Sequence, residues 1–174
     1  MTQKILVPLD GSDVGEAVLP KLQELVLRDI PGKEVEITLL KVISKMNFNA
    51  LHEDEAAQLP YSEAEVKQLT DEANSYLNSV ADNLKAKGFK VKVIVTFGSA
   101  APEIVKAANG TDANLIAMAT HGRSGFVRWA IGSVSDKVIR LEGKIPVLAL
   151  RSSGEKESNP VIATDSLQSL MRHI

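Results

Sequence analysis

One loop of the sequence combines the glycine and hydroxyl residues that bind anions through backbone amides. It contains Gly122, Gly125, Gly132, Ser133 and Ser135. Glycine can adopt positive φ, and because it has no β-carbon it lets backbone amides approach an anion closely. The two serines fall at the start of an expected helix, where free amides and the positive end of the helix dipole favour phosphate. The loop is therefore a candidate phosphate site; the alternative is a turn that only reverses the chain.

Charged side chains accompany this loop and a second loop near the N-terminus. Arg123 and Arg128 could add positive charge to a phosphate site, although Arg128 could equally be a solvated surface residue. Asp10 ends an apolar run and is followed by Gly11 and Ser12. A carboxylate at the end of a strand is commonly a turn or capping residue. Asp10 therefore becomes a site candidate only if the two loops meet in the fold.

Other familiar site patterns are missing from the sequence. No Gly-x-Gly-x-x-Gly follows the first apolar run, and neither the Walker pattern nor Gly-x-Ser-x-Gly occurs. His121, Ser124 and Asp10 could be imagined as a hydrolytic trio, but His121 and Ser124 belong to one tight loop. The chain has no cysteine, which excludes disulfides and thiol chemistry, and its three histidines are scattered. We expect no catalytic residues and no metal cluster.

Composition places the chain among ordinary globular proteins. With 174 residues, 44% of them apolar and 24% charged, it suits one domain. The net charge of −2 argues against nonspecific binding to nucleic acid. No apolar run approaches the roughly 18 residues of a membrane span, and the first residues lack a signal-peptide core. We expect a cytoplasmic protein with neither a nucleic-acid nor a membrane partner.

Two hydrophobic periods alternate along the chain. Apolar runs predict strands at 5–9, 35–43, 90–97, 115–119 and 146–150. Helical periodicity predicts helices from Asp13, from Ser62 with a capping box to Glu65, from Ser99, and over 134–141 with Val134, Val138 and Leu141 on one face. Pro20 removes a backbone donor, so it bends the first helix unless that helix begins later than Asp13.

The alternation of strands and helices predicts a Rossmann-like α/β fold. Right-handed crossovers give a five-stranded parallel sheet with helices on both faces, and we expect the strand order 3-2-1-4-5. Ligands of such sheets bind beyond the carboxyl ends of the strands, where the strand order reverses. That point lies between the first and fourth strands. The loops at Asp10 and after Thr120 would meet there.

Three segments together resemble the universal stress protein family. They are 5–12, 114–125, and 132–135 followed by 146–148. The resemblance covers nearly all of residues 4–150. It implies the fold just described, with domain limits at 1–150 and a separate C-terminal segment.

The ATP-binding branch of that family carries Gly-x2-Gly-x9-Gly-Ser/Thr. Gly122, Gly132 and Ser133 match the last two glycines and the hydroxyl, whereas Ala119 stands at the first glycine position. A site that needs only room there tolerates alanine; a site that needs positive φ is weakened by it.

The resemblance also implies how a ligand lies. Adenine would sit near the ends of the first two strands, with Asp10 accepting a hydrogen bond from the nucleoside or helping to hold Mg²⁺. The phosphates would lie across the glycine-rich loop and the start of the next helix. The implied binding residues are Pro8, Leu9, Asp10, Val42, Met118, Ala119, Thr120, His121, Gly122, Arg123, Gly132, Ser133, Val134 and Ser135.

These expectations define a nucleotide-responsive stress protein that binds ATP, AMP or a related adenine nucleotide, with slow ATP hydrolysis at most. The alternatives are a nucleotide-free dimeric adaptor and an ATP pyrophosphatase-type enzyme that adenylates a substrate. Family members pair as homodimers through the fifth strand, here the apolar residues Val147, Leu148, Ala149 and Leu150. We expect that strand to be an uncovered edge, which invites pairing.

Two segments have no assigned role. The stretch 44–60 has no hydrophobic period, so we interpret it as a loop that covers the nucleoside or is disordered. Residues 151–174 begin as a polar linker and end with Leu167, Leu170, Met171 and Ile174 at helical spacing. This amphipathic tail either docks on its own chain or binds a protein partner.

Overall fold

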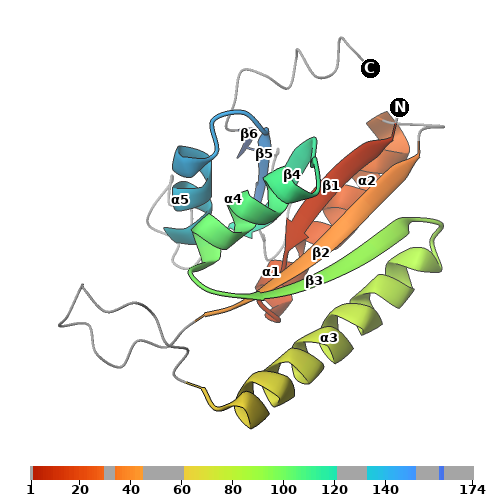
Figure 1. The fold of residues 1–174 in the computed structure, drawn as a ribbon. Coiled ribbons are helices and arrows are strands. Elements are labelled where there is room, and N and C mark those ends of the chain that lie inside the picture. The colour runs from red at the N-terminus through yellow and green to blue at the C-terminus, as the bar shows by residue number, and fades with distance from the viewer. Residues whose placement is uncertain (1, 30–33, 45–60, 121–132, 152–160, 163–174) are drawn as a thin grey trace.

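A computed structural model describes residues 2–29, 34–44, 61–120, 133–151 and 161–162. Its sheet has the order β3-β2-β1-β4-β5-β6 (Figure 1). The strands are β1 (Gln3–Pro8), β2 (Val35–Ile43), β3 (Lys90–Phe97), β4 (Leu115–Thr120), β5 (Val147–Arg151) and β6 (Val161–Ile162). The first five are parallel, so the predicted fold and the order 3-2-1-4-5 are confirmed.

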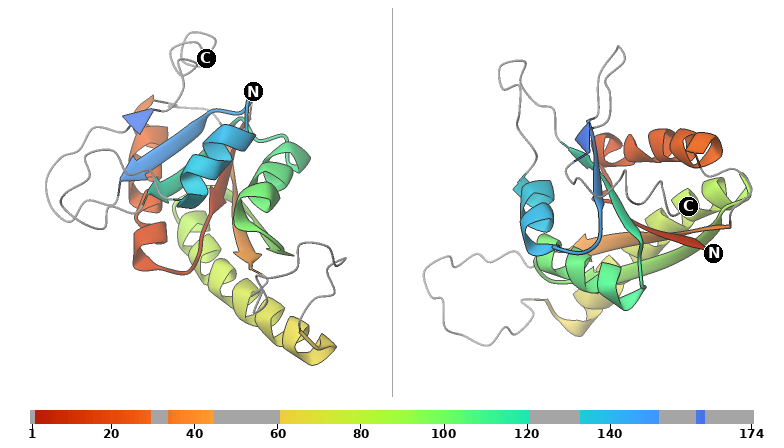
Figure 2. Two further views of the ribbon diagram at one scale, coloured as in Figure 1. Left: turned by 90° about the vertical axis from the view of Figure 1, so that its left-hand side faces the viewer. Right: turned by 90° about the horizontal axis from the view of Figure 1, so that it is seen from above.

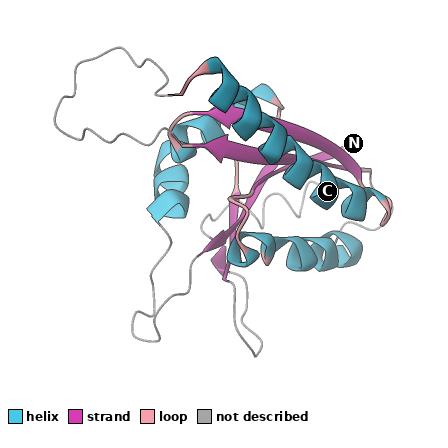
Figure 3. Cartoon of the chain, turned by 90° about the horizontal axis from the view of Figure 1, so that it is seen from below, coloured by secondary structure: helices cyan, strands magenta, loops and turns pink. Residues whose placement is uncertain are grey.

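Helices cover both faces of the sheet and give a three-layer α/β domain (Figure 2). The helices are α1 (Asp13–Glu16), α2 (Val18–Asp29), α3 (Glu63–Lys85), α4 (Ala100–Gly110) and α5 (Ser133–Leu141). Helices α2 and α3 pack on one face, and α4 and α5 pack on the other. Figure 3 shows α3 lying along the strands at its side of the sheet.

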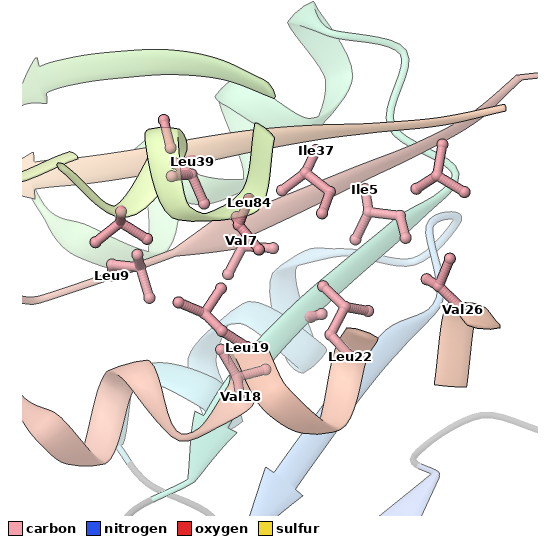
Figure 4. Close-up of a cluster of buried hydrophobic side chains, with 14 of the residues drawn as sticks. Ile5, Val7, Leu9, Val18, Leu19, Leu22, Val26, Ile37, Leu39 and Leu84 are labelled. Carbon is pink, nitrogen blue, oxygen red and sulfur yellow. The ribbon is translucent and has the colours of Figure 1, made fainter. Parts of the chain in front are cut away.

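Alternation along the strands divides the core into two clusters. In β1, Ile5 and Val7 join the cluster beneath α2 and α3, whereas Leu6 joins the cluster beneath α4 and α5. Figure 4 shows the first cluster, in which Leu19 and Leu22 of α2 lie close to the β1 and β2 side chains. Apolar residues on both faces explain why β1 reads as a continuous apolar run.

The β1–α1 connection resolves the question raised by Pro20. Two helices follow β1, because α1 ends at Glu16 and α2 begins at Val18. Pro20 therefore lies in the first turn of α2, where its missing N–H is not needed. The cap of α1 is Ser12, one residue before the predicted start, and its side chain accepts a hydrogen bond from the Gly15 amide at 3.0 Å.

The capping box predicted for the long helix is confirmed. Ser62 caps α3 by accepting from the Glu65 amide, and Glu65 accepts in turn from the Ser62 amide at 2.8 Å. The helix α4 begins after Ser99 as predicted, but the Ser99 side chain makes no capping hydrogen bond.

The expectation of an uncovered β5 edge is wrong. Strand β6 pairs antiparallel with β5, with Leu148 opposite Ile162 and Ala149 opposite Val161. This short strand belongs to the segment that we interpreted as a linker and tail. Its Val-Ile pair is too short to stand out as a strand in the sequence. The predicted amphipathic tail beyond it lies outside the described residues.

The apolar face predicted for α5 is also only partly correct. Val138 is fully buried, whereas Val134 is 36% exposed and Leu141 is 56% exposed. Ser135 is buried instead, because it faces the end of β4. Across the described ranges, no helix is long and apolar enough to span a membrane.

Candidate functional site

A pocket of about 250 Å³ opens at the carboxyl ends of β1, β2 and β4. Strand β1 lies between β2 and β4, so this is the point where the strand order reverses. Strands β1 and β2 pair from Gln3 to Pro8, whereas the β1–β4 register covers only Ile5↔Leu115 and Leu6↔Ile116. The pocket lies beyond those pairs, at the ends of these strands.

Nine of the predicted binding residues line this one pocket. They come from four separate segments: Pro8, Leu9, Asp10, Val42, Met118, Ala119, Ser133, Val134 and Ser135. The end of β4 and the start of α5 therefore reach the same cavity as the loop after β1. Thr120 ends β4. The predicted residues His121, Gly122, Arg123 and Gly132 lie outside the described residues.

Sequence reasoning missed five residues of the pocket. These are Gly15, Leu40, Ser44, Ala100 and Ile104. Leu40 could have been found by alternation, because it shares a face of β2 with Val42. Ala100 and Ile104 are four residues apart on α4, the spacing of a single helix face, but the sequence does not say which helix walls the pocket.

The Asp10 turn presents a carboxylate to the pocket in a fixed orientation. Asp10 Oδ1 accepts hydrogen bonds from the Ser12 amide at 2.9 Å and from Ser12 Oγ at 2.6 Å. Ser12 Oγ in turn accepts from the Gly15 amide. The turn is thus tied to the first turn of α1, and Gly11 at its centre has a φ of +87°. Asp10 itself is exposed, so its carboxylate remains accessible to a ligand.

The end of β4 and the start of α5 form the opposite wall of the pocket. Ser135 is 3% exposed, and its Oγ lies 3.5 Å from the Ala119 carbonyl oxygen. Ala119 is half-buried and packs against the core beneath α2 and α3. Ser133 and Val134 are exposed at the mouth of the pocket. The amides at the start of α5 therefore lie at the open end of the cavity.

The lining is mainly apolar, with a few polar groups at its edges. Leu40, Ile104 and Met118 are buried, while Asp10 and Ser133 are exposed at the rim. Such a lining suits a flat apolar ring inside and a polar group at the mouth. In the part of the chain that the structure describes, no group of three acidic or histidine side chains could hold a metal ion.

The fold and the pocket together define a doubly wound α/β protein with a pocket at the topological switch point. The sequence model of the universal stress protein family matches residues 1–151. The chain belongs to that family, as its three sequence segments indicated.

The universal stress protein MJ0577 of Methanocaldococcus jannaschii is a similar relative. It is 30% identical over 165 residues, a match that covers 87% of this chain and 96% of the relative. The solved MJ0577 structure superposes with a TM-score of 0.64 and 28% identity, covering 88% of this chain and 98% of that one.

Two further solved structures share the fold and contain nucleotides. A universal stress protein in complex with cAMP has a TM-score of 0.54 and 18% identity, covering 87% of this chain and 98% of that chain. An Arabidopsis thaliana family member with AMP bound has a TM-score of 0.57 and 12% identity, covering 87% and 93%. At these identities the likeness is one of fold.

Proposed function

We propose that this universal stress protein binds ATP or another adenine nucleotide in the pocket at the ends of β1, β2 and β4. The observation that carries the proposal is the convergence of Asp10, Val42 and Ser135 on one cavity, from segments far apart in the chain. Relatives of the same fold hold cAMP and AMP, which supports an adenine nucleotide as the ligand class.

The shape of the pocket suits a nucleoside with its phosphates outside. A volume of about 250 Å³ falls just below the roughly 300–1,000 Å³ of small-molecule sites, so it has room for the base and not for the whole nucleotide. Adenine would lie against Val42, Leu40 and Ile104, and the Asp10 carboxylate would accept a hydrogen bond from the nucleoside. The phosphates would point toward the amides at the start of α5 and toward the predicted Gly122–Gly132 loop.

In this proposal Mg²⁺ binds together with the nucleotide phosphates and is not held by the protein alone. Mg²⁺ is usually bound by one or two carboxylates together with substrate phosphates and waters. Asp10 is the only carboxylate among the described pocket residues, and its Oδ1 already accepts two hydrogen bonds from Ser12. One carboxylate is compatible with a phosphate-bound Mg²⁺ but does not make a metal site alone.

The proposed role is regulation by ligand binding in the cytoplasm. A ligand shifts a conformational equilibrium only by binding two states differently, and the pocket is lined by five chain segments whose relative positions such a ligand would bias. A second copy of the chain could pair with β5 only if β6 moved away from it. The homodimer therefore remains a proposal that depends on displacement of β6. We assign no catalytic residue to the pocket.

A nucleotide-free adaptor is the second candidate, and Ala119 favours it. This residue stands at the first glycine of the binding motif, and its carbonyl oxygen already faces Ser135 Oγ. Calorimetric titration with adenine nucleotides distinguishes the two candidate functions, because a nucleotide-free adaptor gives no saturable heat of binding.

The test is calorimetric titration of ATP, AMP, cAMP and adenosine, with GTP as the specificity control. The variant Val134→Asp places a carboxylate at the mouth of the pocket, beside the proposed phosphates. It should weaken ATP binding about tenfold or more and change adenosine binding little, since like charges repel. The matched control is Leu141→Asp, on the same helix at an exposed position that does not line the pocket. No saturable binding of any adenine nucleotide to the wild type would overturn the proposal.

A further inference from the structure

On the face of the sheet opposite the pocket, Lys41, Tyr76 and Glu16 form a polar cluster at the same strand ends. Leu40 and Val42 line the pocket, so the alternating residue Lys41 points to the other face, toward α3. There its ammonium nitrogen lies 5.0 Å from the centre of the Tyr76 ring. This is the geometry of a cation–π contact. The cluster therefore lies behind the site rather than in it.

Lys41 contacts the backbone of the turn that presents Asp10. Its Nζ donates a hydrogen bond to the Asp10 carbonyl oxygen at 2.9 Å. A β-carbon built on Gly11 would fall 2.9 Å from the same Nζ. The ammonium group is thus packed against two consecutive residues of the turn. The carboxylate of Asp10 is held from the front by Ser12, and its carbonyl is held from behind by Lys41.

Tyr76 connects the same cluster to the helix that follows the turn. Its hydroxyl donates to Glu16 Oε1 at 2.8 Å, across 60 residues of sequence. Glu16 is the last residue of α1, and Ser12, the cap of α1, is the residue that holds the Asp10 carboxylate. Helix α3 thus reaches the turn from both sides, through Lys41 at Asp10 and through Glu16 at α1.

We propose that Lys41 is a positioning residue for the nucleotide pocket, and that the Tyr76 ring and hydroxyl couple the Asp10 turn to helix α3. The proposal rests on the proposed function, since the ligand positioned is the adenine nucleotide. Loss of the Tyr76 contacts with Lys41 or Glu16 then changes the affinity of the pocket on the other side of the sheet.

The variants isolate the hydrogen-bond donor from the bulk of the side chain. Lys41→Met removes the charge and the donor but keeps an unbranched chain, and Lys41→Arg keeps both charge and donor. Lys92→Met is the matched control, because Lys92 pairs with Glu36 on the neighbouring strand and does not line the pocket. Tyr76→Phe keeps the ring beneath Lys41 and removes only the bond to Glu16.

Two readouts are measured on each variant. The first is hydrogen exchange of the Ser12 and Gly15 amides without ligand, which reports on the turn itself. The second is the dissociation constant for ATP. We expect Lys41→Met to speed exchange at both amides and to weaken ATP binding about five- to tenfold, the low end of allosteric coupling. Lys41→Arg should keep the exchange rate and the ATP affinity close to those of the wild type. Tyr76→Phe should change both quantities in the same direction as Lys41→Met, and Lys92→Met should change neither.

The outcomes separate this proposal from the proposed function. Wild-type exchange and ATP affinity in Lys41→Met would overturn the positioning role while leaving nucleotide binding intact. Equal losses in Lys41→Met and Lys92→Met would also overturn it, because the effect would then be general. If the wild type binds no nucleotide, the proposed function falls, and the exchange of Ser12 and Gly15 still decides whether Lys41 holds the turn.

Discussion

The Asp10 carboxylate occupies the space that any side chain at Gly15 would need. A β-carbon built on Gly15 falls 2.5 Å from Asp10 Oδ1 and 3.4 Å from Ser12 Oγ. Both residues line the pocket. Because Gly15 has no side chain, the Asp10 carboxylate can occupy this position. This relationship explains why a glycine stands inside α1, where it is otherwise unfavourable for a helix.

Gly15→Ala should therefore weaken nucleotide binding without unfolding the protein. Alanine suits the helical backbone, but its methyl group displaces the Asp10 carboxylate from the Ser12 donors. We expect roughly a tenfold weaker ATP affinity, about 1.4 kcal/mol, measured by calorimetry. Gly110→Ala at the end of α4 is the control, because a β-carbon there meets nothing within 4 Å. Equal ATP affinity in the two variants would contradict a role for the Asp10 carboxylate.

The base end of the pocket can be tested separately from the phosphate end. Val42 is half-buried and lines the pocket at the end of β2. Val42→Phe should fill the space assigned to adenine and weaken ATP and adenosine binding by similar factors, roughly tenfold each. Val134→Asp, by contrast, should act mainly on ATP. A Val42→Phe protein that loses ATP but keeps adenosine would show that the ligand is oriented the other way round.

Glu142 joins the far ends of the two helices that wall the pocket. This carboxylate is 8% exposed and accepts from the amides of Lys144 and Ile145 at 3.1 Å each, and from Asn109 Nδ2 at 3.2 Å. Glu142→Ala leaves these donors without their acceptor and should lower the free energy of unfolding by about 2 kcal/mol. Glu142→Gln keeps one acceptor oxygen and should lose less. Urea unfolding measures both, and a larger loss in the glutamine variant would argue against this account.

Tyr76 makes the free energy of unfolding depend on pH in the alkaline range. Burial, together with the hydrogen bond to Glu16, raises the pKa of Tyr76 above its ordinary value of about 10. A raised pKa in the folded state stabilises the fold fully below the unfolded-state pKa, and that contribution is lost as the pH rises beyond it. Tyr76→Phe should be less stable than the wild type by about 1 kcal/mol at pH ~8. The gap should shrink above pH ~10. Urea unfolding of both proteins across this range would contradict the account if the gap stayed constant.

Much of the fold follows from hydrophobic period because both faces of the sheet are covered. Strands 35–43 and 90–97 match β2 and β3 end to end, since their apolar residues meet helices on both sides. The ends of β1, β4 and β5 differ by one or two residues, because strand ends depend on the neighbouring strand rather than on their own residues. Strand β6 could not be predicted from two residues.

Part of the pocket lining could be predicted, where a residue type itself suggests the chemistry. Asp10 and Ser133 stand out in the sequence as a carboxylate and a hydroxyl beside glycines. Gly15 and Ile104 do not, because their role depends on which helix lies against which strand end. The role of Lys41 depends on tertiary contacts with Asp10 and Tyr76 that no local pattern encodes.

The most direct measurement is an NMR titration of the isotopically labelled protein with ATP and Mg²⁺. We predict saturable shifts concentrated at the amides of Leu9, Asp10, Val42, Ala119, Ser133 and Ser135, with smaller changes at Tyr76. Adenosine should shift the Val42 end and leave the start of α5 nearly unchanged. Spectra that do not change at millimolar ATP, or shifts confined to surfaces away from these strand ends, would contradict nucleotide binding at this pocket.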